Sequence, residues 1–144
     1  MIGIDTNVLL RWVLHDDEEQ AARARKVFEG AESILITDIV LVETVWTLRG
    51  KRYKATKEDI QALVISLLEE PNMVFESKQV IWSALNDFVA NKPVKIAKDT
   101  KTADLADALI VNKTKRAARD RRLTYQGTYT FDRAELRIDG TIKA

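Results

Sequence analysis

The sequence predicts an α/β protein, with a short, mostly parallel central sheet of four to five strands in a three-layer α/β/α arrangement. Short apolar runs of the β type alternate along the chain with longer runs in which apolar residues recur every three or four positions. The expected order is a strand followed by two helices, three times over, and then two short strands. Such an order favours parallel strands with helices on both faces. The length suits a single domain spanning residues 1–144.

The first half of the chain is expected to form two strands and four helices. A strand at residues 2–4 precedes a helix at 6–14, and acids at 16–19 open a second helix that Gly30 ends. Residues 33–36 form the next strand, with a helix at 39–49 behind it. The run Thr56-Lys57-Glu58-Asp59 is typical of a capping box, and the apolar pattern after it predicts a packing helix.

The second half is expected to form two helices and the remaining strands. Residues 73–75 form a strand, Ser77 caps a helix, and Pro93 marks the loop that follows. A further helix begins around Thr102 and carries Asp104 and Asp107 on one face near its positive end. The last strands are expected at 129–131 and, as a short edge strand, at 136–138.

The composition excludes several kinds of chemistry. The chain has no cysteine and a single histidine, His15, so thiolate metal sites, cysteine nucleophiles and paired-histidine RNA cleavage are ruled out. A metal site would need oxygen ligands, which favours Mg²⁺ or Mn²⁺ over Zn²⁺. Neither a long apolar span nor a secretory leader is present, so we expect a cytoplasmic protein without membrane contact. No dinucleotide fingerprint or phosphate-binding P-loop occurs among the five isolated glycines.

Acidic residues are expected to meet at one edge of the sheet. Asp5 and Asp132 directly follow strands, while Glu43 and the pair Asp104 and Asp107 lie in helices that begin near the same edge. Gathered carboxylates repel one another, and a divalent cation would relieve that repulsion. Oxygen-only sites of this kind hold one or two Mg²⁺ or Mn²⁺ ions and cleave phosphodiesters by attack of a metal-bound water.

Four motifs, read in order, resemble the PIN-domain family, and within it the VapC-type toxins of type II toxin–antitoxin systems. The motifs are Ile4-Asp5-Thr6-Asn7-Val8-Leu9-Leu10-Arg11, Leu41-Val42-Glu43 with Trp46-Thr47-Leu48, Ala103-Asp104-Leu105-Ala106-Asp107-Ala108-Leu109-Ile110, and Thr130-Phe131-Asp132-Arg133. The resemblance covers nearly the whole chain. The approach to the last strand, residues 121–127, is longer than the usual short turn of the family.

The resemblance implies a catalytic site and a biological role. It makes Asp5, Glu43, Asp107 and Asp132 an acidic quartet, with Asp104 as an accessory carboxylate. Asp5 and Asp107 would bind Mg²⁺, with Mn²⁺ as a substitute, and Asn7 and Thr130 would orient the carboxylates. It further implies an endoribonuclease, a homodimer, and inhibition by a cognate VapB-type antitoxin. The alternatives are a non-toxin PIN-domain nuclease in RNA processing and a non-catalytic scaffold that binds RNA or protein.

Two basic clusters leave two interpretations open. Residues 49–54 and 113–122 are rich in Lys and Arg, and Arg116, Arg119 and Arg122 are candidates for RNA contacts. The same charges also suit solvated helix ends, and the second cluster would equally suit an antitoxin. The tryptophans Trp12, Trp46 and Trp82 are interpreted as core or interface anchors in preference to base-stacking platforms. An aspartyl-phosphate enzyme is disfavoured, because Asn7 stands where the second acid is needed.

Overall fold

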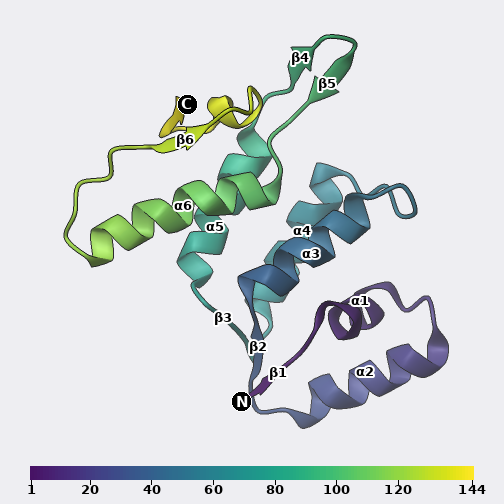
Figure 1. The fold of residues 1–144 in the computed structure, drawn as a ribbon. Helices are drawn as coiled ribbons and strands as arrows, with labels where there is room; N and C mark the ends of the chain where they lie inside the picture. Colours follow the sequence, from purple (N-terminus) through teal and green to yellow (C-terminus); the bar gives the residue numbers. More distant parts are fainter. The chain divides into compact units, whose positions relative to one another are not determined.

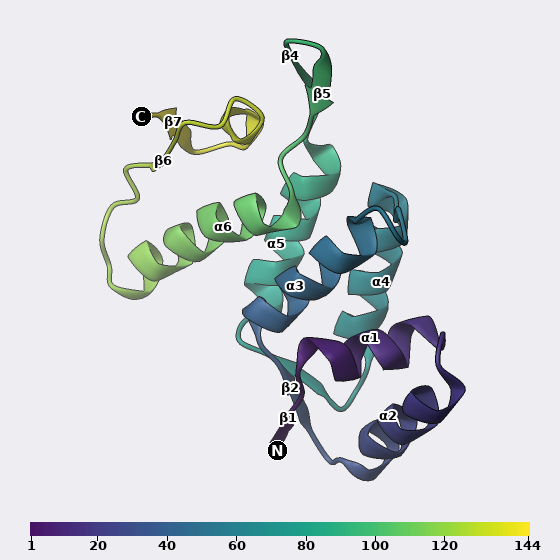
Figure 2. The same cartoon turned by 45° about the vertical axis from the view of Figure 1, so that its right-hand side comes forward.

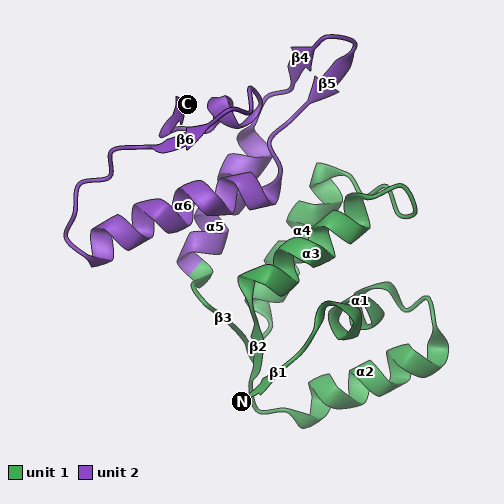
Figure 3. Ribbon diagram, in the orientation of Figure 1, with its two compact units in different colours: residues 1–78 green, residues 79–144 purple.

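The computed structural model describes all residues 1–144, which form two compact units, unit 1 at residues 1–78 and unit 2 at 79–144 (Figure 3). Six α-helices and seven short strands make up the regular structure. None of these helices is both long and apolar enough to cross a membrane. The predicted α/β class, with its mostly parallel pairing, is confirmed by this set of elements. The expected number of strands in the central sheet is wrong: that sheet has three strands instead of four to five, because the later strands pair with one another in two separate sheets.

Unit 1 is built on a parallel three-stranded sheet. Its strands are β1 (Ile2–Gly3), β2 (Ile34–Ile36) and β3 (Met73–Phe75), paired in that order. Its helices are α1 (Thr6–Leu14), α2 (Glu18–Gly30), α3 (Asp38–Arg49) and α4 (Lys57–Glu69). Both α2 and α3 contact α1, which lies between them in two views (Figures 1 and 2). Strands β1 and β2 each lead at their carboxyl end into a helix of unit 1, and β3 leads into α5 (Lys78–Ala90), which starts at the unit boundary.

Short polar side chains start these helices where the sequence predicts. Asp5, Asp17 and Thr37 each accept a backbone N–H from the first turn of α1, α2 and α3, respectively. Thr56 and Asp59 form the predicted capping box of α4, in which each side chain accepts the other's backbone N–H. These bonds satisfy donors that a helix otherwise leaves open, and they set where each helix begins.

An aromatic pair contributes to the packing between α1 and α2. The ring of Trp12 stacks on that of Phe28, with centroids 4.8 Å apart and an angle of 19° between the planes. Trp12 is thus a packing residue, as predicted. Trp46 and Trp82 are 54% and 48% exposed, so neither is a core residue.

One charged side chain joins the end of α1 to the loop after α3. Asp16 accepts hydrogen bonds from the Arg11 guanidinium at 2.6 Å and from the Tyr53 hydroxyl at 3.1 Å. The bond from Arg11 is the main reason why the pKa of Asp16 lies below its ordinary value. A lowered folded-state pKa stabilises the fold above the unfolded-state value, and this stabilisation is lost as the pH falls through the folded-state pKa.

Replacing Asp16 by asparagine is therefore expected to destabilise the protein at neutral pH. The variant should melt below the wild type at pH 7, and the difference should shrink as the pH falls below about 4. The control is Glu19→Gln, which removes one charge from the exposed surface of α2. Thermal melts of the three proteins across this pH range provide the measurement. Equal losses in both variants, or a loss at acid pH as large as at pH 7, would contradict the assigned role.

Unit 2 combines two helices with two small sheets. Its elements are α5 (Lys78–Ala90), which starts at the unit boundary, β4 (Val94–Ile96), β5 (Asp99–Lys101), α6 (Leu105–Asp120), β6 (Thr128–Thr130) and β7 (Thr141–Lys143). Strands β4 and β5 pair antiparallel, and β6 and β7 pair parallel. The amide of Asn112 on α6 donates to the Asp87 carboxylate on α5 at 2.7 Å. Phe88 and Leu105 are fully buried.

The predicted edge strand at 136–138 is wrong. Residues Glu135–Arg137 form a short 3₁₀ helix, and the strand lies later, at β7. The Asp132 carboxylate explains the turn, because it accepts the backbone N–H groups of Ala134 at 2.7 Å and Glu135 at 3.4 Å. An aspartate that binds backbone N–H groups two and three residues ahead favours a turn over an extended strand.

Candidate active site

In unit 1, the first two predicted acids are connected through Thr6. Asp5 follows β1 and caps α1, its carboxylate accepting the Val8 backbone N–H at 2.9 Å. The next residue, Thr6, donates its hydroxyl to the Glu43 carboxylate on α3 at 2.5 Å. Glu43 is exposed, contrary to what its apolar sequence neighbours suggest. The hydrogen bond thus brings Glu43 to the residue beside Asp5, at the carboxyl end of β1.

Two further acids lie at the same edge of the unit 1 sheet, and the sequence analysis missed both. Asp38 opens α3 just after β2, and Glu76 follows β3 directly. Glu76 accepts the backbone N–H of Asp38 at 2.6 Å, and Asp38 itself is buried. The signal was available, because Glu76 directly follows an apolar β-type run and Asp38 comes two residues after another. Their contact with each other gives them a structural role at the start of α3.

In unit 2, Asp104 and Asp107 form a reciprocal cap at the start of α6. The Asp104 carboxylate accepts the Asp107 N–H at 2.9 Å, and the Asp107 carboxylate accepts the Asp104 N–H at 2.8 Å. Asp104 is the capping residue and so lies just outside the helix in which the sequence placed it. This arrangement holds two carboxylates close together at the positive end of a helix, where negative charge is best tolerated.

The electrostatic surroundings of Asp107 are unusual. Burial and the neighbouring charges of Asp104 and Glu135 raise the pKa of Asp107 to about 6. The hydrogen bond from the Asp104 backbone N–H acts in the opposite direction but is outweighed. Asp107 is half-buried, which makes its charged form costly without a compensating cation. A carboxyl group with a raised pKa beside other acids is typical of functional sites.

Thr130 and Asp132 make different contacts from those the sequence implies. The Thr130 hydroxyl donates to Glu135 at 2.6 Å and accepts the Asp132 backbone N–H at 2.9 Å. Glu135 is a buried carboxylate that the sequence analysis missed, although the spacing Asp132-x-x-Glu135 is a capping signal. Because Glu135 also acts on the pKa of Asp107, Thr130 is connected to the acids of α6 through Glu135.

The donor set fits a hard cation. In neither unit do three or more His, Cys, Asp or Glu side chains gather into a ready metal site. In unit 1, however, Glu43 is bonded to Thr6, the residue after Asp5, and unit 2 holds Asp104 and Asp107 with Glu135. The acids all offer carboxylate oxygens, and burial, together with the neighbouring charges of Asp104 and Glu135, raises the pKa of Asp107. Oxygen donors under mutual repulsion are the ligands that Mg²⁺ and Mn²⁺ take.

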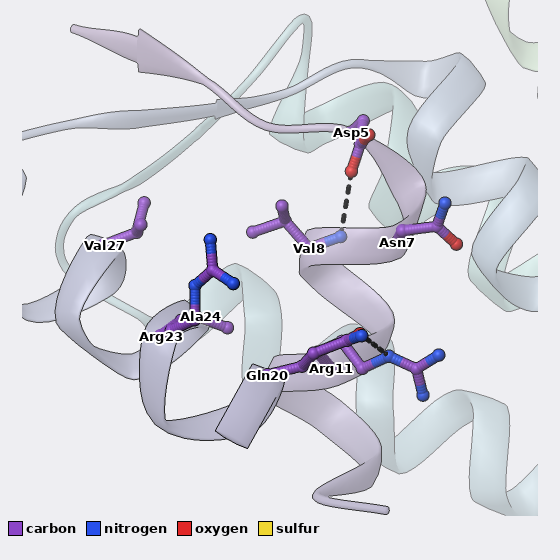
Figure 4. Close-up of a pocket in the computed structure, with 8 residues that line it drawn as sticks. All are labelled: Asp5, Asn7, Val8, Arg11, Gln20, Arg23, Ala24 and Val27. Carbon is purple, nitrogen blue, oxygen red and sulfur yellow. Dashed lines mark hydrogen bonds between the residues drawn. The ribbon is translucent and has the colours of Figure 1, made fainter. Parts of the chain in front are cut away.

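A cavity of about 340 Å³ in unit 1 adjoins Asp5. It lies between α1 and α2, and its lining includes Asn7 and Arg11 (Figure 4). Asn7 is exposed, and its side-chain amide has no hydrogen-bond partner. A second cavity, of about 310 Å³, also has Asn7 and Arg11 in its lining, together with Trp46 and residues of the loop after α3. Asn7 therefore has an amide available beside Asp5.

The arginines proposed for RNA contacts differ in their environment. Arg116 binds Asp120, one turn ahead on α6, at 2.8 Å and 2.9 Å, and also Gln79 at 3.2 Å. Arg119 and Arg122 are exposed and form no ion pair. The guanidinium of Arg116 is therefore already held within the protein, whereas those of Arg119 and Arg122 are open to solvent and to a phosphate.

Comparison with known proteins identifies the family. No curated protein matches the chain significantly. The model of the PIN domain family matches residues 2–118, which include Asp5, Glu43, Asp104 and Asp107 and end before Asp132. The PIN domain is a nuclease-type fold. Since the match covers most of the 144 residues, the chain belongs to the PIN domain family.

Proposed function

We propose that this chain is a Mg²⁺-dependent endoribonuclease and the toxin of a VapBC-type toxin–antitoxin system. The observation that carries the nuclease proposal is the Thr6–Glu43 hydrogen bond, which ties a second carboxylate to the residue that follows Asp5, near the carboxyl end of a parallel strand. The raised pKa of Asp107 supports it from the other acidic motif. Both features agree with an oxygen-only cation site.

The proposed site uses the acids in distinct ways. By the family resemblance, Asp5 and Asp107 would hold the cation, Glu43 and Asp132 would complete the quartet, and Asp104 would be accessory. Thr6 holds Glu43 in place, and Asn7 offers an amide to orient a carboxylate or a water. When bound, Mg²⁺ supplies Lewis-acid activation of the attacking water and neutralises charge on the phosphate.

Thr130 has an indirect role in this proposal. Its hydroxyl fixes Glu135, whose charge acts on Asp107. Because Thr130 holds Glu135 at 2.6 Å, the proposed function makes it a positioning residue for the acids of α6.

Cleavage of single-stranded RNA in the presence and absence of metal tests the nuclease proposal. EDTA should abolish cleavage, and Mg²⁺ or Mn²⁺ should restore it. The products should carry 5′-phosphate and 3′-hydroxyl ends, because water and not the ribose 2′-hydroxyl attacks the phosphate. Cleavage that persists in EDTA, or a 2′,3′-cyclic phosphate product, would contradict this mechanism.

The toxin role rests on the resemblance of the four acidic motifs to VapC-type proteins. Induced expression in a bacterial host should arrest growth, and the Asp5→Asn variant should not. A short DNA-binding partner, expressed together with the chain, should relieve the arrest and co-purify with it. A chain that cleaves RNA in vitro without arresting growth would favour a nuclease of RNA processing. Light scattering of the purified protein tests the expected homodimer.

Neutralising Arg119 and Arg122, which form no ion pair, should weaken RNA binding more than neutralising Arg116, which is paired with Asp120. The double variant Arg119→Gln/Arg122→Gln is expected to lower affinity and to flatten the dependence on salt, since each lost phosphate contact reduces the slope by about 0.7 for a single strand. Arg116→Gln serves as the control, because its guanidinium is already bound to Asp120. Fluorescence anisotropy in EDTA provides the measurement. Equal affinities of both variants and the wild type would identify the cluster as a solvated helix end.

A further inference from the structure

The cavity between α1 and α2 has the size and the lining of a small-ligand site. At about 340 Å³ it falls within the range of roughly 300–1,000 Å³ that ligand pockets occupy. Its lining residues are Asp5, Asn7, Val8, Arg11, Gln20, Arg23, Ala24 and Val27. Figure 4 shows that they come from two neighbouring helices, with Asp5, Asn7, Val8 and Arg11 on α1 or just before it and the others on α2. All of them belong to unit 1.

The two arginines of this cavity differ in what they already bind. Arg11 donates to Asp16 at 2.6 Å and to Gln20 at 2.7 Å, so its charge is compensated within the protein. The side chain of Arg23 is exposed, and its guanidinium forms neither an ion pair nor a hydrogen bond within the chain. A guanidinium without a partner at the wall of a cavity is suited to a phosphate group, which it binds through two parallel hydrogen bonds.

The remaining walls suit the rest of a nucleotide. Val8, Ala24 and Val27 give an apolar surface against which a base or a ribose can lie. The unpartnered amide of Asn7 offers a donor and an acceptor to the groups of a sugar or a base. The Asp5 carboxylate, by contrast, repels a phosphate unless a cation is bound to it. A phosphate therefore fits the Arg23 end of the cavity, and Asp5 marks the reacting end.

We propose that the cavity binds the nucleotide adjacent to the bond that is cut, with Arg23 holding its phosphate and Val27 forming part of the wall for its base. The inference rests on the proposed function, because Asp5 defines where cleavage takes place. It adds a binding subsite on α2, a helix that carries none of the proposed catalytic acids. The positively charged guanidinium of Arg23 on α2 thereby determines how the RNA strand enters the site.

A pair of matched variants tests the role of Arg23. Arg23→Gln and Arg25→Gln remove the same charge from exposed positions of the same helix, but only Arg23 lines the cavity. With a labelled single-stranded oligoribonucleotide in EDTA, Arg23→Gln should weaken binding roughly tenfold. It should also reduce the salt slope by about 0.7, while Arg25→Gln stays close to the wild type. Equal affinities for the two variants would overturn the proposal.

A third variant tests the cavity itself. Val27 is 40% exposed, so Val27→Trp can fill the space without disturbing the core. In Mg²⁺ it should raise KM for RNA with little change in kcat and leave the melting temperature unchanged. An unchanged KM in a folded variant would overturn the subsite.

Separate results would disprove the nuclease function and the nucleotide subsite. If the wild type cleaves no RNA in Mg²⁺, the proposed nuclease function is wrong, whatever the binding results. If the wild type cleaves RNA but the variants Arg23→Gln and Val27→Trp behave like Arg25→Gln, the nuclease function stands and the subsite is wrong.

Discussion

Replacing Asp5 by asparagine is expected to abolish RNA cleavage and to leave the fold intact. Asparagine keeps an oxygen that accepts the Val8 backbone N–H, which Asp5 now accepts at 2.9 Å, so the start of α1 is preserved. It loses the negative charge that a cation requires. Since a bound metal contributes several kcal/mol to the stabilisation of the transition state, kcat should fall by roughly a hundredfold or more.

Asp17→Asn is the matched control for this prediction. Asp17 caps α2 as Asp5 caps α1, accepting the Gln20 backbone N–H at 2.9 Å, and it lines neither cavity of unit 1. The two variants should melt alike, and only Asp5→Asn should lose cleavage. Steady-state cleavage of a fluorogenic RNA and thermal melts measure both effects. If Asp5→Asn keeps its activity, Asp5 is only a helix cap.

Replacing Asp107 by asparagine is expected to stabilise the metal-free protein. In the wild type, Asp107 accepts the Asp104 backbone N–H at 2.8 Å, and the asparagine oxygen can accept the same bond. Asparagine has no negative charge, so the repulsion from the neighbouring acids is removed. Because the folded-state pKa of about 6 lies above the ordinary value of 3.8, stability falls as the pH rises between these values. The gain at pH 7 is on the order of 1 kcal/mol, after allowance for the solvent that screens a half-buried group.

Thermal melts in EDTA between pH 3 and pH 8 measure this effect. The difference between Asp107→Asn and the wild type should be largest above about pH 6 and should vanish below about pH 4. Asp99→Asn, at an exposed position of β5, removes an equal charge and should leave the melts unchanged. Saturating Mg²⁺ should stabilise the wild type more than Asp107→Asn. If Asp107→Asn melts below the wild type at pH 7, the carboxylate is a structural cap and Asp104 would be the third acid.

Elements with strong local signals could be predicted from the sequence. The helix at 6–14 and the capping box at Thr56 follow from apolar periodicity and from a polar residue at the start. The β4–β5 hairpin could not be predicted in this way. Its turn places Ala97 at φ +55°, a conformation that Gly or Asn normally signals, so no turn signal was present.

The candidate acids stand out in the sequence, but their contacts do not. An acid just after an apolar β-type run is a local signal, and Asp5, two residues after β1, is one example. The bond from Thr6 to Glu43 joins residues 37 positions apart, a pairing that local patterns do not contain. Glu135 was missed although its spacing from Asp132 is a capping signal, because its importance arises from its bond with Thr130 and from the charge it exerts on Asp107.

Titration with Mn²⁺, followed by electron paramagnetic resonance, tests most directly whether Asp5 and Asp107 are needed for cation binding. The wild type, Asp5→Asn, Asp107→Asn and the control Asp17→Asn are compared at the same protein concentration. The account predicts that the wild type and Asp17→Asn bind Mn²⁺ alike, and that Asp5→Asn and Asp107→Asn each raise Kd by roughly tenfold or more. Equal Mn²⁺ affinities for all four proteins would contradict it.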